Sequence, residues 1–66
     1  MNSSELAISL KPGDRITTIL DRDFVVGQVH CDPDGYWIEP EGADEYTWWI
    51  PVANVRKLNG ADAELA

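Results

Sequence analysis

The sequence predicts one small all-β domain, and three observations point to this fold class. The 66 residues are too few for two packed domains. Short runs rich in β-branched and aromatic residues alternate with turns that contain Pro, Gly and Asp, a pattern typical of a small sandwich or barrel. No segment has the apolar spacing of a helix of about ten residues or more. We therefore expect five short strands, with a single-turn 3₁₀ helix before the last.

The first two strands are predicted around a short polar loop. Lys11–Asp14 (KPGD) is expected to form a turn, and the next segment, Arg15–Leu20 (RITTIL), is rich in β-branched residues. After the loop Asp21–Asp23, the second strand is expected over Phe24–His30 (FVVGQVH). Gly27 in this strand predicts a bulge or a close approach between backbones, as a tightly curled sheet requires.

Two further strands follow a second turn. Asp32–Gly35 (DPDG) carries Asp, Pro and Gly where a type I turn followed by a left-handed residue needs them. The third strand is predicted over Gly35–Glu39 and ends at Pro40, which has no N–H for central pairing. The loop Glu41–Asp44 then leads to a fourth strand, Tyr46–Ile50 (YTWWI).

The last two elements complete the pattern. A 3₁₀ turn is expected at Pro51–Asn54, because Pro suits the first position of such a turn and Asn its end. Val55–Leu58 is then the final strand. Five strands with one 3₁₀ turn before the last are the chain order of an SH3-like barrel, which we expect over residues 11–58.

The two flanking segments are expected to be flexible. Residues 1–10 form a polar leader, although Leu6, Ile8 and Leu10 alternate and could add an edge strand. Residues 59–66 (NGADAELA) form a frayed tail with little apolar surface to hold it to a core. The leader lacks the basic and apolar regions of a signal peptide, and no run approaches the roughly 18 apolar residues of a membrane span. We therefore expect a cytoplasmic protein that does not contact a membrane.

The chain is strongly acidic. Twelve Asp and Glu against five Lys and Arg give a net charge of −7, and no Lys or Arg occurs between Arg22 and Arg56. This distribution argues against direct binding of nucleic acid or an anionic membrane through a broad basic patch. The acid excess suits plain solubility, and it also suits a surface that docks on a basic protein or mimics nucleic acid. The candidate acidic face consists of Asp32, Asp34, Glu39, Glu41, Asp44 and Glu45.

Most aromatic residues fall on two adjacent predicted strands. Because successive strand residues face opposite sides, Trp48 and Trp49 should divide between core and surface, as should Tyr36 and Trp37. An exposed Trp usually marks an interface or a ligand groove, unless residues 1–10 cover it. The predicted interface for self-association or for a partner comprises Tyr36, Trp37, Tyr46, Thr47, Trp48, Trp49 and Ile50.

The sequence contains no clear catalytic or metal-binding constellation. Cys31 is the only cysteine, which excludes an internal disulfide, and on one strand it would point away from its neighbour His30. We expect this thiol in the core or at its rim. The acids match no calcium loop, and no spacing singles out a pair for acid–base catalysis. We therefore expect no catalytic residue, no metal and no cofactor.

One short segment resembles a known family of binding domains. Pro51–Val55 (PVANV) is similar to the Pro-Ser-Asn-Tyr-Val segment that ends eukaryotic SH3 domains. The opening motif and the long first loop of those domains are missing, and their peptide-binding tyrosine falls on Asn54. The resemblance therefore implies the fold and not the recognition of Pro-rich peptides.

A longer stretch, residues 13–58, resembles the plasmid-type, trimethoprim-insensitive type II dihydrofolate reductases. Gly13–Ile16 (GDRI) is similar to the family's Gly-Asp-Arg-Val, Gly27–Val29 (GQV) to its Gly-Gln-Ile, and Pro33–Tyr36 (PDGY) to its Pro-Glu-Gly-Tyr. Ile50–Ala53 (IPVA) lies where the family has Tyr-Pro-Val-Ala. The resemblance implies an SH3-like barrel in a homotetramer, whose central pore binds NADPH and dihydrofolate.

The pore motif of that family is not retained. Thr47–Ile50 (TWWI) replaces Val-Gln-Ile-Tyr, and the pore lysine falls near Thr18. Because NADPH and folate are anions, a site without this cation in an acidic chain should bind them poorly. We therefore predict a non-catalytic SH3-like module that self-associates through Tyr46–Ile50 and the neighbouring strand and binds a basic protein. The alternatives are a divergent type II dihydrofolate reductase and an acidic inhibitor that mimics nucleic acid.

Overall fold

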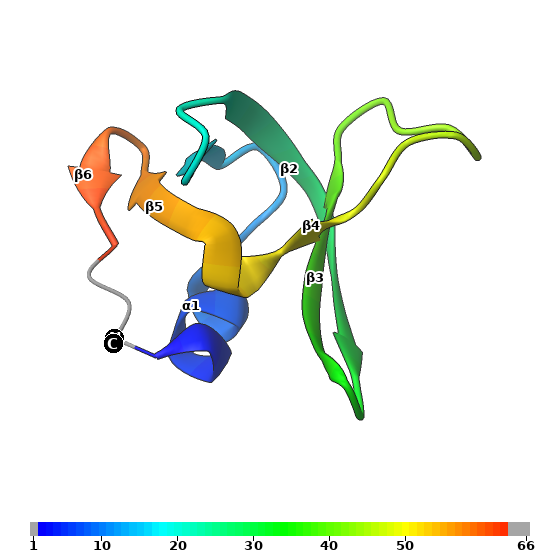
Figure 1. The fold of residues 1–66 in the computed structure, drawn as a ribbon, viewed down its shortest axis with the longest axis horizontal. Helices are drawn as coiled ribbons and strands as arrows, with labels where there is room; N and C mark the ends of the chain where they lie inside the picture. The colour runs from blue at the N-terminus through cyan, green and yellow to red at the C-terminus, as the bar shows by residue number, and fades with distance from the viewer. Residues whose placement is uncertain (1, 64–66) are drawn as a thin grey trace.

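One antiparallel sheet, with a short helix packed beside it, forms most of the fold (Figure 1). The structure is a computed structural model, and it describes residues 2–63. The elements in chain order are α1 (Ser3–Ser9), β1 (Arg15–Thr18), β2 (Asp23–Asp32), β3 (Gly35–Pro40), β4 (Ile50–Pro51), the 3₁₀ helix η1 (Val52–Asn54), β5 (Val55–Leu58) and β6 (Ala61–Asp62). The sequence predicted an all-β domain, and the structure is mostly β, with one α-helix of seven residues.

The sheet is open, and its strand order is β4-β3-β2-β1-β5-β6. The sequence predicted five strands closed into a barrel, and neither the strand number nor the closure is confirmed. The additional strand, β6, lies in the segment that was expected to be a frayed tail, and it pairs with β5. Ala63 is buried behind it, and its N–H donates to the Arg56 carbonyl oxygen at 2.9 Å. The last three residues of the predicted tail lie outside the described residues.

The first hairpin is built as its turn residues predict. In the turn Lys11–Asp14, the Asp14 N–H donates to the Lys11 carbonyl oxygen at 3.0 Å, and Gly13 has a φ of +94° that favours glycine. β1 then pairs with both β2 and β5. It ends at Thr18, so the predicted strand was two residues too long, and Ile19 and Leu20 lie in an exposed turn.

The long β2–β3 hairpin confirms two further predictions. Its turn lies at Pro33–Asp34, and Gly35, with a positive φ, begins β3. The pairing register shifts at Gly27, where an added Cβ would lie 3.0 Å from the Glu39 carbonyl oxygen. Only glycine therefore allows the two backbones to approach this closely, and the strand bends at this bulge.

The prediction of a flexible leader or an edge strand in residues 1–10 is wrong, because residues Ser3–Ser9 form the helix α1. The Asn2 side chain caps the helix by accepting a hydrogen bond from the Glu5 N–H at 2.9 Å. Leu6 and Leu10 are four residues apart, which places both on one helical face, and both are buried. The intervening Ile8, which suggested strand alternation, is 83% exposed.

The core lies where α1 and η1 cover the sheet (Figure 1). Each of the elements α1, β1, β2, β3 and η1 contributes one side chain that is fully buried, and these are Leu6, Ile16, Val26, Ile38 and Val52. The 3₁₀ turn at the predicted position and the strand Val55–Leu58 are both confirmed. The hairpin β2–β3 extends beyond this core and carries the site described next.

Candidate functional site

Residues 41–49 form a long loop between β3 and β4, so the prediction of a strand over Tyr46–Ile50 is wrong for all but Ile50. Side chains close this loop. Asp44 Oδ1 accepts hydrogen bonds from the Tyr46 N–H (2.9 Å) and the Thr47 hydroxyl (3.0 Å). Thr47 Oγ1 in turn accepts one from the Asp44 N–H (3.1 Å). These local bonds replace the strand ladder, which is why the strand propensity of the aromatic run does not decide its structure.

The same hydrogen bonds stabilise the ionised form of the Asp44 carboxyl group. They lower the pKa of its carboxyl group below the ordinary value of 3.8, and the hydrogen bond from the Tyr46 N–H is the largest cause, followed by that from the Thr47 hydroxyl. The carboxylate is therefore ionised at neutral pH, where it both orders the turn and contributes negative charge to the loop.

The two consecutive Trp residues of the loop are both at the surface. Trp48 is 90% exposed and Trp49 is 42% exposed, so the prediction that one of them fills the core is wrong. The alternation that led to it applies to strands, and these residues lie in a loop. The alternative that residues 1–10 cover the outer Trp is also wrong, because Trp48 is almost completely exposed. Tyr46 on the same loop is 83% exposed.

Trp49 is held in place by the β2–β3 hairpin. Its indole stacks on the His30 ring, with the ring centroids 3.9 Å apart and the planes 2° from parallel. The His30 ring also lies 2.9 Å from Glu39, between Nε2 and Oε1, and since a carboxylate only accepts, Nε2 donates. His30 thus connects the loop to both strands. No pattern in the sequence indicated this role of His30.

Strand alternation does hold on β3. Tyr36 packs against the core, while Trp37 and Glu39, two residues apart, lie on the other face of the strand with His30 of β2. The predicted division between Tyr36 and Trp37 is therefore seen. Cys31, which follows His30, is exposed and not in the core.

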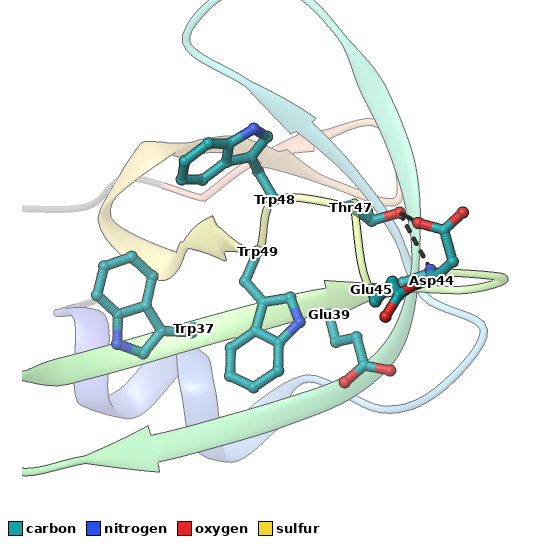
Figure 2. A pocket seen from close by; sticks show the side chains of 8 residues that line it. Trp37, Glu39, Asp44, Glu45, Thr47, Trp48 and Trp49 are labelled. Atoms are coloured by element: carbon teal, nitrogen blue, oxygen red, sulfur yellow. Dashed lines mark hydrogen bonds between the residues drawn. The ribbon is translucent and has the colours of Figure 1, made fainter.

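These residues together form an open groove of about 630 Å³ (Figure 2). Figure 2 shows Trp49 between Trp37 and Glu39, with Asp44 and Glu45 at one end and Trp48 pointing away from Trp49. The lining is aromatic and acidic, and it consists of Trp37, Glu39, Ala43, Asp44, Glu45, Thr47, Trp48 and Trp49. Within the described part of the chain, no Lys or Arg lines it. We call it the aromatic–acidic groove.

A second concavity, of about 420 Å³, adjoins the groove at the same loop. It includes the exposed side chains of Ile19 and Leu20 and the partly buried Ile50 and Phe24. Thr47, Trp48 and Trp49 line both concavities. The loop therefore presents two indoles, Trp48 and Trp49, where an acidic groove adjoins an apolar one.

The six residues of the predicted acidic face do not form one face. Asp32 and Asp34 lie at the tip of the β2–β3 hairpin, whereas Glu39 lies near the other end of β3, about 13 Å from the first and about 17 Å from the second at roughly 3.3 Å per strand residue. Glu39, Asp44 and Glu45 line the groove together, and Glu41 lies in the turn just before Ala43. Charge alone did not distinguish these two groups, because their separation depends on the length of β3.

Among residues 2–63, no group of three His, Cys, Asp or Glu side chains is placed to hold a metal ion. No helix in this part of the chain is long and apolar enough to cross a membrane. Comparisons of the chain with protein-family models, curated proteins and solved structures found no match. The candidate site therefore rests on its own geometry.

Proposed function

We propose that this protein is a non-catalytic, SH3-like interaction module that self-associates and binds a basic protein partner through the loop 41–49. The observation that carries the proposal is Trp48, which is 90% exposed on a loop fixed by its own hydrogen bonds. Large apolar side chains on the surface of a small domain usually mark an interface, and Trp is prominent among the residues that dominate binding energy. The proposal includes no catalytic residue and no cofactor.

The SH3-like scaffold in this proposal is supported by the connectivity. β1 pairs with β2 on one side and with β5 on the other, so the first and last strands of residues 11–58 are neighbours, and η1 comes directly before β5. The register shifts at Gly27 and between Thr17 and Thr18 provide the bends that a curled sheet needs. A cytoplasmic location fits the exposed thiol of Cys31, which an oxidising compartment would leave open to intermolecular disulfides.

Self-association is supported by the apolar concavity beside Trp48. Ile19, Leu20 and Trp48 leave apolar surface exposed around it, and a 66-residue domain gains stability from burying such surface against a second copy. Binding of a basic partner is supported by the carboxylates of the aromatic–acidic groove, which favour a positively charged surface.

The test is the molar mass in solution, measured by light scattering and sedimentation velocity. We expect the wild type to associate and Trp48→Ala to shift it toward the monomer. The matched control is Ile8→Ala, which removes another exposed apolar side chain, on α1, and should leave association unchanged. A strictly monomeric wild type, or equal behaviour of the two variants, contradicts self-association through this loop.

The second candidate is type II dihydrofolate reductase activity, and it is favoured by the glycines in the motifs that resemble those of that family. Gly13 and Gly35 have positive φ values and Gly27 lies at a close backbone approach, so the shared motifs coincide with backbone features. The groove residues do not fit the cofactor, because Glu39, Asp44 and Glu45 would repel the phosphates of NADPH. Trimethoprim-insensitive NADPH oxidation that depends on dihydrofolate would establish this activity, and its absence together with no NADPH binding removes it.

A further inference from the structure

We infer that the aromatic–acidic groove holds an arginine side chain of the basic partner, stacked on indole and paired with carboxylate. This inference rests on the proposed function, because it names the chemistry that the partner inserts. It concerns the aromatic–acidic groove and not the apolar concavity proposed for self-association.

The charge of the groove supports a cationic occupant. Glu39, Asp44 and Glu45 line one concavity of about 630 Å³. Among the described residues, the Lys or Arg ion pair joins Arg56 to Asp21, so no Lys or Arg pairs with these three carboxylates, and Glu39 has His30 as its partner. Glu39 and Asp44 each use one oxygen, Oε1 and Oδ1, in the hydrogen bonds given above. These hydrogen bonds fix both side chains, so the second carboxylate oxygen of each residue is also held in position.

The aromatic part of the groove supports a flat cation. An indole attracts a cation to its face through the negative charge of its π system, and Trp is the strongest of the aromatic side chains in this respect. The His30 ring covers one face of Trp49, yet this residue is 42% exposed. Trp37 lies beside it in the same groove (Figure 2). Because the stack on His30 fixes Trp49, little side-chain entropy is lost when a ligand binds it.

Arginine fits this combination better than lysine. Its guanidinium group is planar and can stack on an indole, while its N–H groups point outward in a fork that matches a carboxylate. A lysine ammonium group is compact and strongly hydrated, so it gains less from a flat aromatic surface beside carboxylates. A groove with both indoles and carboxylates in its lining therefore favours the guanidinium group.

The experiment is a titration of the full chain with three glycine-spaced peptides of equal length, which carry arginine, lysine or the neutral isostere citrulline. Trp fluorescence and calorimetry report binding. We expect the arginine peptide to bind most tightly, the citrulline peptide to lose about tenfold or more in affinity, and added salt to weaken the arginine complex. The peptide series needs no variant, so a folding defect cannot imitate the result.

Two charge variants locate the binding. Glu45→Gln removes an exposed groove carboxylate that makes no hydrogen bond with residues 2–63, and we expect it to weaken binding of the arginine peptide about threefold. Asp34→Asn removes the same charge at the far tip of the hairpin and should leave the affinity unchanged. Equal weakening by both variants shows a response to net charge and overturns the inference.

Other outcomes also overturn it. No binding of the arginine peptide excludes the groove as an arginine site, and equal affinity for the lysine or citrulline peptide excludes the stacked guanidinium group.

The failure of the inference can be distinguished from that of the proposed function. If no peptide binds but Trp48→Ala still dissociates the protein, self-association stands and only the arginine site is lost. If Trp48→Ala changes nothing while the arginine peptide binds, the self-association arm fails and the arginine site stands.

Discussion

Large apolar side chains are buried on the face of the sheet that α1 covers, whereas most of those on the loop 41–49 are exposed. Under α1 and η1, Leu6, Ile38 and Val52 are fully buried. On the loop, Tyr46 and Trp48 are almost fully exposed, although they are larger. The difference arises because hydrogen bonds to Asp44 and Thr47 order the backbone around Tyr46, and the stack of Trp49 on His30 anchors the end of the loop, so neither Tyr46 nor Trp48 needs to be buried. Stability and binding should therefore depend on different residues, and substitutions should separate them.

The largest expected effect is on the covered face. Leu6→Ala leaves a cavity among α1, the sheet and η1, and we expect it to reduce the free energy of unfolding by about 2–5 kcal/mol. Trp48→Ala removes a larger side chain but should change this free energy by no more than about 0.5 kcal/mol in the monomer. Urea denaturation at low protein concentration measures both. Similar losses for the two variants would show that the loop contributes to the core.

A smaller effect is expected where the two regions meet, at His30. His30→Ala removes the stack on Trp49 and the hydrogen bond to Glu39, so we expect a loss of about 1 kcal/mol in the free energy of unfolding and a weaker near-ultraviolet circular dichroism of the indoles. Cys31→Ser, at the exposed neighbouring position, is the control and should change neither quantity. If both variants match the wild type, His30 does not hold the loop.

The smallest effect is on the loop alone and depends on pH. The lowered pKa of Asp44 means that its hydrogen bonds order the turn above the ordinary value of 3.8, and that this ordering is lost as the pH falls through the lower value of the folded state. The Tyr46 amide resonance in NMR spectra should therefore shift with pH below about 3.8, before the core unfolds. Asp44→Asn should abolish this titration, and its persistence would assign it to another group.

The elements that the sequence predicted well are those whose signal is local. Gly13 and Gly35 occupy positive-φ positions in turns, and these turns set the limits of β1, β2 and β3. Gly27 marked the close approach of two strands correctly. These residues act through their own backbone conformation, so their neighbours in space need not be known.

The errors arose where a pattern fits two structures or where contacts are distant in sequence. Leu6 and Leu10 fit both strand alternation over a short run and one face of a helix, and the Asn2 cap with burial against the sheet decides for the helix. The aromatic run lost its strand to the hydrogen bonds of Asp44. The contact of Trp49 with His30 joins residues far apart in the chain, and no local pattern could indicate it.

The anchoring of the loop at both ends has a consequence for protein engineering. At its start, the Glu41 N–H donates to the Val25 carbonyl oxygen at 2.8 Å, and near its end Trp49 is stacked on His30. Between these anchors, Glu45, Tyr46 and Trp48 project into solvent from a turn that other residues hold together. These three positions could be randomised in a library while the anchors are kept, which would make this small domain a scaffold for selecting new binding specificities.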